Sequence, residues 1–312
     1  SMCLRPEFTI PVCLLHLGAG AAARRYGYVG TVFRQQQDGA SEFLQAGIED
    51  IGHEDIIAAD AQSLADAKAS LTALGVGDEA QTLLGDQAVF DAVLKTLGLP
   101  SGWRLQLTHA FGNEKALAAA LNKLAQPEQM PSLPAGLLEA LQADETQRAQ
   151  ALVQAHLQDA GLTNAGGRNA EEITARLRSK LHVAQSTPDA GKLGILRAFL
   201  QLRVPLSEAT GKLESFERDY GLDIAGAVAQ FAKRTAALVA AGLDLQTMTY
   251  DASFGRPLDY YSGLVYEMRG PDGTVLAGGG RYDHLLSLLG ADKPVSGVGF
   301  SLWLDRIAEL RS

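Results

Sequence analysis

The sequence has little cysteine, no long apolar run and no secretion signal. Cys3 and Cys13 are the only cysteines among 312 residues, so neither a disulfide framework nor a cysteine metal site is expected, and a reducing cytoplasm fits. Hydrophobic residues make up 46%, yet no uninterrupted stretch is long enough to span a membrane. No signal peptide precedes Cys3, and Ser1-Met2 is typical of a cloning remnant. We expect a globular cytoplasmic protein with no membrane partner.

Blocks of basic residues are also absent, and the formal net charge is −9. Proteins that follow a phosphate backbone need clustered lysine and arginine. A local basic patch can still occur on an acidic protein, so acidity alone does not exclude tRNA. The charge nevertheless makes nucleic acid an unlikely main partner.

Several familiar catalytic and cofactor patterns are missing. The six histidines show no metal-ligand spacing, and no Ser-His-Asp or Cys-His arrangement is legible. No Gly-Lys-Ser/Thr follows Gly278–Gly280, so this run is not a P-loop, and close packing of strands explains it better. We therefore expect no metal and no cofactor.

Two compositional regimes alternate along the chain. Residues 3–53 and 248–300 are rich in aromatic and β-branched residues with glycine punctuation, and alternating stretches such as Phe43-x-Gln45-x-Gly47-x-Glu49 predict antiparallel strands. Residues 60–247 are rich in alanine and leucine at helical spacing. This pattern predicts an α+β fold, in which both chain ends build one sheet and a helical region lies between them in sequence.

Local signals support these assignments. Asp86 is a candidate cap for a helix with an apolar stripe that ends before Gly98. Asn169 and Glu172 form a capping-box pattern. Residues 268–274 predict a hairpin turn between strands at 264–267 and 275–277.

The most informative stretch is Gly255-Arg-Pro-Leu-Asp-Tyr-Tyr-Ser-Gly-Leu-Val-Tyr-Glu267, in which guanidinium, carboxylate and phenol groups run into a predicted strand. Such groups can grip a planar polar ligand. Three further segments accompany it in order: Leu4–Pro11; Tyr28–Arg34 with Glu42–Glu49; and Gly278–Asp283 with Gly297–Arg306. Together they resemble the histidine-binding and class II segments of histidyl-tRNA synthetases, and still more closely the paralogous regulatory subunits of ATP phosphoribosyltransferase.

The resemblance implies a class II aminoacyl-tRNA synthetase-like antiparallel sheet flanked by helices. Residues 1–84 and 246–312 are expected to form this core, and residues 85–245 a mainly helical insertion. We expect the core to lack the first class II motif, because none precedes Leu4, and we expect no anticodon-reading domain after Arg306.

The resemblance also implies a histidine site. Glu7, Thr9 and Gln45 would face the ammonium group, Glu49 and the Tyr261 hydroxyl the imidazole, and Arg256 the carboxylate. Glu7 and Thr9 would share one face if their segment is extended. The alternative interpretation makes Glu7, Glu49 and Arg256 structural ion pairs, with Tyr260 and Tyr261 as core aromatics; for Tyr260, packing is the preferred interpretation.

Catalytic groups of the resembled synthetases are only partly present. Arg34 and Arg306 match arginines that would contact nucleotide phosphates, but Gln36 replaces the glutamate that would read adenine. Trp303 stands where the third class II motif has glycine, and an indole there would fill the adenine space. Arg34 and Arg306 are therefore interpreted as remnants of a nucleotide site that now make structural salt bridges.

The resemblance implies a non-catalytic regulatory subunit in the first step of histidine biosynthesis. Its expected partner is a short catalytic subunit of ATP phosphoribosyltransferase, a glycosyltransferase, in a hetero-oligomer with L-histidine as feedback effector. One alternative is a histidyl-tRNA synthetase-like amino-acid-activating enzyme. Another is a free-standing protein that reports histidine to a different target.

Overall fold

The computed structural model describes residues 4–20, 22–35, 40–125, 133–134, 136–161, 169–185, 190–256 and 260–311. The chain divides into two compact units. Unit 1 consists of residues 1–96, 111–113 and 197–312, and unit 2 of residues 97–110 and 114–196. The sequence-based prediction, a core of residues 1–84 and 246–312 with an insertion of residues 85–245, stays a prediction.

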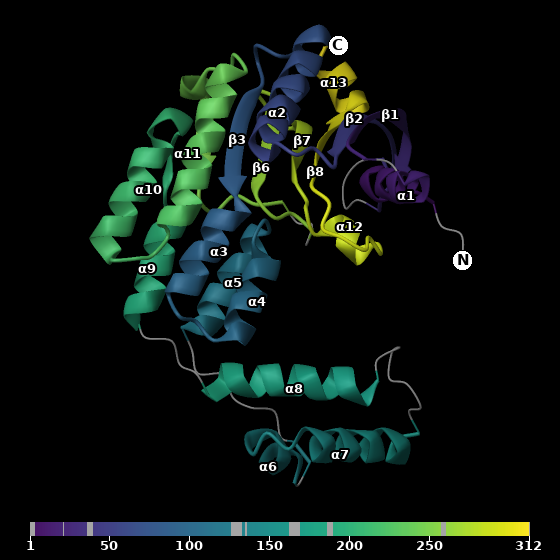
Figure 1. Cartoon of the computed structure of the whole chain (residues 1–312), viewed down its shortest axis with the longest axis vertical. Helices are drawn as coiled ribbons and strands as arrows, with labels where there is room; N and C mark the ends of the chain where they lie inside the picture. The colour runs from purple at the N-terminus through teal and green to yellow at the C-terminus, as the bar shows by residue number, and fades with distance from the viewer. Residues whose placement is uncertain are drawn as a thin grey trace. The chain divides into compact units, whose positions relative to one another are not determined.

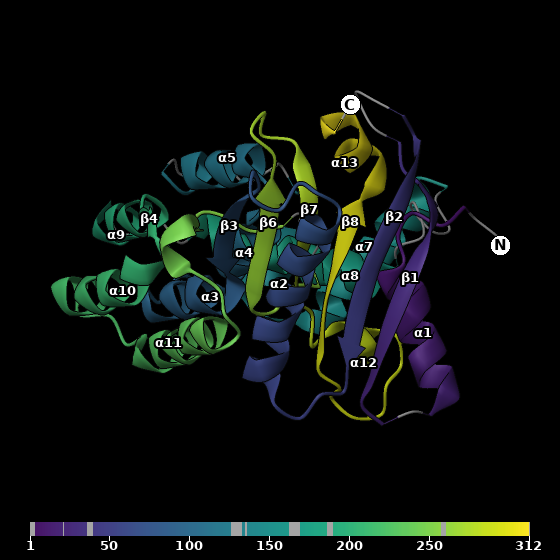
Figure 2. The ribbon, with the colours of Figure 1, turned by 90° about the horizontal axis from the view of Figure 1, so that it is seen from above.

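Unit 1 is built on one sheet of eight strands, in the order β1-β2-β8-β7-β6-β3-β5-β4 (Figure 1, Figure 2). The strands are β1 (Arg24–Phe33), β2 (Glu42–Ile51), β3 (Gln81–Asp86), β4 (Arg203–Pro205), β5 (Met248–Asp251), β6 (Leu264–Arg269), β7 (Val275–Arg281) and β8 (Gly297–Trp303). All neighbouring pairs are antiparallel except β3 with β5, which are parallel. The predicted α+β architecture from both chain ends is confirmed.

Helices cover both faces of the sheet of unit 1. On one face lie α2 (Ile56–Ala73) and α11 (Ala225–Ala240), and α2 packs on β2, β6, β7 and β8 (Figure 2). On the other face α1 (Thr9–Ala19) packs through Val12 and Cys13 against Ile51 and Tyr282. Because side chains alternate along a strand, Gln45 and Glu49 of β2 share the face of α1.

The remaining helical segments of unit 1 are α3 (Gln87–Thr96), α10 (Leu206–Tyr220), α12 (Leu285–Leu288), α13 (Leu304–Leu310) and the 3-10 turn η1 (Leu245–Thr247). Asp86 caps α3, since its Oδ1 accepts from the backbone N–H groups of Ala88 and Val89 at 2.9 and 3.3 Å. The predicted cap and the hairpin turn between β6 and β7 are both confirmed.

Unit 2 is helical over its described residues. It contains α4 (Ser101–Ala110), α5 (Glu114–Leu124), α6 (Leu137–Gln142), α7 (Thr146–Asp159), α8 (Ala170–Gln185) and the first part of α9 (Ala190–Leu200). Leucine, alanine and valine of α6, α7 and α8 form a separate apolar core. The predicted capping box at the start of α8 is confirmed, because Glu172 N–H donates to Asn169 Oδ1 at 2.8 Å and Asn169 N–H to Glu172 Oε2 at 3.3 Å.

Two details differ from the sequence-based expectation. Residues 7–9 are not an extended segment, because α1 begins at Thr9; Pro11 falls in the first turn, where a missing N–H costs no helical hydrogen bond. In addition, β3 and β4 are strands of the sheet, although residues 60–247 were expected to be helical. Within the described residues, no helix is both long and apolar enough to cross a membrane.

Candidate functional site

A pocket opens on the face of the sheet that carries α1. It encloses about 400 Å³ of space between atoms, part of it open to solvent. Its walls come from the start of α1, from β2, β7 and β8, and from residues between β5 and β6. The lining residues are Glu7, Thr9, Arg34, Gln45, Glu49, Arg256, Tyr260, Tyr261, Gly278, Tyr282, Gly299, Phe300, Ser301 and Trp303. The six residues of the predicted histidine site therefore all line one pocket.

Glu49 is the buried carboxylate at the base of this pocket, with an exposed fraction of 1%. Thr9 Oγ1 donates to its Oε1 at 2.7 Å, and the Tyr282 hydroxyl donates to its Oε2 at 2.5 Å. Burial raises the pKa of Glu49 to about 7, although these two hydrogen bonds act in the opposite direction. A side chain at Gly299 would collide with Glu49 Oε2, so glycine on β8 makes room for this carboxylate.

Gln45 precedes Glu49 by four residues on β2, and its side chain is fully buried. Neither its Nε2 nor its Oε1 has a hydrogen-bond partner among the described residues. Burying a primary amide without partners is costly. An amide that lines a pocket in this condition is a ready donor and acceptor for a polar ligand.

Arg256 lies flat on the sheet over Gly278, where a β-carbon would meet its guanidinium. Its Nη1 donates to Glu267 Oε1 at 3.1 Å, and its buried Nε has no partner among the described residues. The guanidinium carbon lies 5.7 Å from the centroid of the Trp303 ring. Arg256 therefore has a counter-ion on one side and an unused donor on the other.

Tyr260 and Tyr261 stand side by side at the pocket wall, with ring centroids 5.0 Å apart. Tyr260 also makes an edge contact with Tyr282, at a centroid distance of 6.0 Å. Both rings are about half-buried or more, and burial raises the pKa of both phenols, so they remain neutral donors near neutral pH.

Glu7 reaches the pocket from outside α1. Both of its carboxylate oxygens accept from the Ile10 N–H, at 3.0 and 3.2 Å. This contact ties Glu7 to the first turn of the helix, where negative charge is favourable. It replaces the extended arrangement expected for Glu7 and Thr9.

The end of the pocket near Trp303 is apolar and filled. Trp303 is buried in a cluster with Phe8, Val32 and Phe43. Arg34 Nε donates to the Pro6 carbonyl at 2.7 Å, and Arg306 Nη1 to the Val275 carbonyl at 3.1 Å. The salt bridges expected for these arginines do not occur among the described residues.

Arg34 lines the pocket, whereas Arg306 lies against Trp303, its guanidinium carbon 5.4 Å from the ring centroid. Gln36, expected at the adenine position, lies outside the described residues. No group of three or more His, Cys, Asp or Glu in the described part of the chain is arranged to hold a metal ion.

Sequence reasoning missed two tyrosines. Tyr282 belongs to a quoted segment but was given no role, although its hydroxyl contacts Glu49. The hydroxyl of Tyr28, on β1, contacts Ser301 Oγ at 2.7 Å and donates to the Phe300 carbonyl at 3.2 Å. Tyr282 lies between Arg281 and Asp283, whose side chains form an ion pair at 2.7 Å, but no local signal in the sequence indicates its contact with Glu49.

Comparison with known proteins identifies the family. The family model for histidyl-tRNA synthetase matches residues 1–187 and 151–307. The ATP phosphoribosyltransferase regulatory subunit of Brucella anthropi is 46% identical over 317 residues, covering 99% of this chain and 84% of the relative. That of Brucella canis is 46% identical over 315 residues, with the same coverage. The chain belongs to the family of ATP phosphoribosyltransferase regulatory subunits.

Solved structures confirm the class II synthetase-like fold of this family member. A protein from Bacillus halodurans, described as an ATP phosphoribosyltransferase regulatory subunit/histidyl-tRNA synthetase, matches with a TM-score of 0.61 and 21% identity, covering 98% of this chain and 64% of that one. Histidyl-tRNA synthetase from Nostoc sp. PCC 7120 matches with a TM-score of 0.62 and 15% identity, covering 98% and 59%. The fold alone follows from these two matches.

Proposed function

We propose that this chain is a non-catalytic, histidine-binding subunit that regulates ATP phosphoribosyltransferase in the cytoplasm. The observation that carries the proposal is the buried amide of Gln45, which has no hydrogen-bond partner among the described residues and lines the same pocket as the buried carboxylate of Glu49. Two buried amide atoms without hydrogen bonds destabilise a fold. A zwitterionic amino acid with a polar side chain would provide the missing hydrogen bonds.

Each group of L-histidine finds a counterpart in the pocket. The carboxylate suits Arg256, whose Nε has no hydrogen-bond partner among the described residues. The ammonium group needs acceptors, which the Gln45 oxygen and the acidic side chains supply. The imidazole needs a donor and an acceptor when neutral, and Glu49 with a tyrosine hydroxyl meets that need. Both protonation states of Glu49 are accessible near neutral pH, since its pKa is raised to about 7.

The lack of catalysis is supported by the opposite end of the pocket. Trp303 packs with Phe8 and Phe43, and by the resemblance it stands at the position where a glycine would leave room for adenine. Arg34 and Arg306 donate to backbone carbonyls. We therefore expect histidine to bind without ATP, and no histidine-dependent pyrophosphate exchange above background.

Regulation requires a partner, which the names of the relatives suggest: a catalytic subunit of ATP phosphoribosyltransferase. In this proposal the subunit activates a short catalytic chain in a hetero-oligomer, and histidine inhibits the assembly. Histidine must then bind the inhibited state more tightly than the active one. The coupling free energy for such control is typically ~1–3 kcal/mol.

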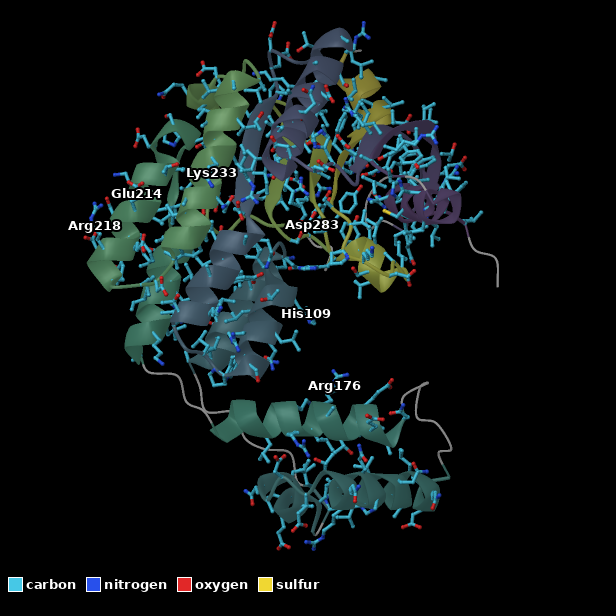
Figure 3. The ribbon with its side chains drawn as sticks, viewed as in Figure 1. His109, Arg176, Glu214, Arg218, Lys233 and Asp283 are labelled. Carbon is cyan, nitrogen blue, oxygen red and sulfur yellow. The ribbon has the colours of Figure 1, made fainter. Side chains whose placement is uncertain are left out.

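The test combines calorimetry with an activity assay of the reconstituted complex. Glu49→Gln and Arg256→Ala should each weaken L-histidine binding by about 1.5–3 kcal/mol, the range for hydrogen bonds to charged groups. Glu49→Gln should still activate the catalytic subunit but blunt its inhibition by histidine. Glu214→Gln, an exposed change on α10 (Figure 3), is the matched control.

Three results would contradict the proposal. Unchanged histidine affinity in both site variants would remove the site assignment. Equal histidine sensitivity of complexes with wild-type and Glu49→Gln subunits would place feedback on the catalytic chain. Histidine-dependent pyrophosphate exchange would favour a synthetase-like enzyme instead.

A further inference from the structure

A row of alternating charges runs across β6 beside the pocket. Glu267 stands between two arginines: Arg256 Nη1 donates to its Oε1 at 3.1 Å, and Arg269 donates to its Oε2 through Nε at 3.1 Å and Nη2 at 2.8 Å. The exposed side-chain fractions are 10% for Arg256, 12% for Glu267 and 41% for Arg269. The row therefore leads from solvent, through a shielded carboxylate, to a buried guanidinium in the pocket wall.

Glu267 contacts only one edge of Arg256. The guanidinium is held against the sheet, because it lies over Gly278 and its Nη1 also approaches the Tyr266 carbonyl at 3.5 Å. Its Nε makes no hydrogen bond among the described residues. A ligand carboxylate can thus approach Arg256 while Glu267 keeps its own contact.

We infer that Glu267 is the resident counter-ion of Arg256 and sets how strongly the pocket prefers a ligand with a free carboxylate. This inference rests on the proposed histidine site. Glu267 is a positioning residue, since it acts through Arg256. Its charge has two effects: it compensates Arg256 when the pocket is empty, and it repels a second carboxylate brought to the same guanidinium.

Neutralising Glu267 separates these two effects. In Glu267→Gln the amide oxygen still accepts from Arg256, so the orientation is retained, but the empty pocket then contains an uncompensated buried cation. A ligand carboxylate becomes the missing counter-ion, and carboxylate-bearing ligands gain affinity. L-histidinol has the imidazole and ammonium of histidine with a hydroxymethyl group in place of the carboxylate, so it gains nothing.

The experiment measures the affinities of L-histidine and L-histidinol by calorimetry at one pH. In Glu267→Gln the preference for histidine should rise roughly tenfold over wild type, as expected for one charge–charge interaction at moderate effective dielectric. The control Glu214→Gln should leave the ratio unchanged. An unchanged or reduced ratio in Glu267→Gln would overturn the inference, because a purely structural role shifts both ligands equally.

The variant Arg269→Gln provides an independent second test of the inference. Because the Arg269 side chain is half-exposed, the protein should fold with this substitution. Without Arg269, the charge of Glu267 acts on Arg256 alone, so the preference for histidine should fall. A rise or no change in that variant would also overturn the inference. If the wild-type protein binds histidinol as tightly as histidine, the role of Arg256 and Glu267 is overturned but the proposed histidine site is not. If it binds neither ligand, the proposed histidine site is overturned as well.

Discussion

Two of the buried carboxylates in unit 1, those of Asp60 and Glu49, have opposite surroundings and lie on opposite faces of one sheet. Asp60 of α2 has an exposed fraction of 0% and Glu49 of β2 of 1%. Asp60 forms ion pairs with two arginines, whereas the hydrogen bonds that Glu49 accepts from the described residues come from neutral hydroxyl groups. The comparison separates a carboxylate that serves the fold from one to which the proposed function assigns a ligand.

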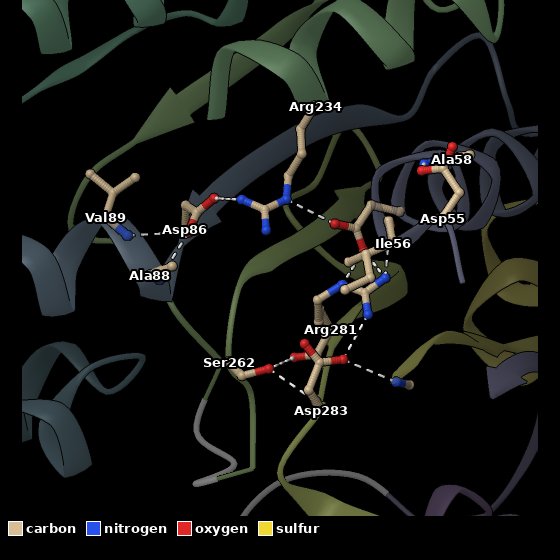
Figure 4. A network of polar contacts seen from close by, with 12 residues as sticks. Asp55, Ile56, Ala58, Asp86, Ala88, Val89, Arg234, Ser262, Arg281 and Asp283 are labelled. Atoms are coloured by element: carbon tan, nitrogen blue, oxygen red, sulfur yellow. Dashed lines mark hydrogen bonds and ion pairs between the residues drawn. The ribbon is translucent and has the colours of Figure 1, made fainter. Parts of the chain in front are cut away.

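Asp60 joins two arginines, Arg234 and Arg281, into one network of ion pairs; both arginines are labelled in Figure 4. Its Oδ2 accepts from Arg234 Nε at 2.8 Å and its Oδ1 from Arg281 Nε at 2.7 Å. Arg234 continues to Asp86 at 3.1 Å, and Arg281 to Asp283 at 2.7 Å. Both partners of Asp60 are thus themselves neutralised, which is how a buried ion pair becomes tolerable.

Glu49 has no such compensation. Among the described residues no arginine, lysine or histidine forms an ion pair with it, and its donors are the hydroxyls of Thr9 and Tyr282. Burial therefore raises its pKa to about 7. Strongly shifted groups in a pocket are typical of functional sites. The missing cation is the feature that an ammonium or imidazolium group would supply.

The largest expected difference concerns stability. Asp60→Asn should destabilise the protein by about 3–5 kcal/mol, because it leaves Arg234 and Arg281 buried without their shared counter-ion. Glu49→Gln should change the free energy of unfolding little at pH 8, or raise it, because a buried uncompensated charge is removed. Denaturant titration of both variants measures this. Equal losses in the two would show that both carboxylates serve the fold.

The second difference is in pH dependence. A carboxyl group whose pKa rises from 4.5 unfolded to about 7 folded gives stability that is complete below pH 4.5 and is lost as the pH rises through 7. At ~1.4 kcal/mol per pKa unit, the loss attributable to Glu49 is about 3 kcal/mol. Subtracting the stability profile of Glu49→Gln from that of wild type should isolate this slope. A flat difference between pH 4 and pH 8 would contradict the shifted pKa.

The sequence predicted the pocket-lining strand β2 better than it predicted the start of α1. Alternation along β2 placed Gln45 and Glu49 on one buried face, as observed, because a strand of the sheet interior must alternate. At the start of α1, the shared face of Glu7 and Thr9 was expected only if their segment is extended, and the segment is instead the beginning of a helix. A proline in the first turn carries no helical hydrogen bond, so the local sequence permits either form and packing against Ile51 and Tyr282 decides.

Pairwise contacts were beyond the reach of the sequence. Nothing in the local pattern indicates that Arg256 pairs with Glu267, or that the Tyr282 hydroxyl reaches Glu49, since both contacts depend on how neighbouring strands are registered. From the sequence, Gly278 was interpreted as close packing of strands, and Gly299 was given no role. The structure shows what approaches them, namely Arg256 and Glu49.

The smallest expected effect tests the neutral donors themselves. Thr9→Val keeps the β-branched shape at the first residue of α1 but removes the hydroxyl that donates to Glu49 Oε1 at 2.7 Å. A hydrogen bond to a charged group is worth about 1.5–3 kcal/mol and one to a neutral group about 1. The variant should therefore lose about 1.5 kcal/mol of stability at pH 8, where Glu49 is ionised, and less at pH 5. It should also raise the pKa of Glu49 further. Ser63→Ala, which removes the contact of Ser63 Oγ with the Tyr266 hydroxyl at 2.8 Å on the opposite face, provides the neutral comparison and should cost the same at both pH values. If Thr9→Val also costs the same at pH 5 and pH 8, Glu49 does not change its charge in that interval, and its contrast with Asp60 would have to be explained by geometry alone.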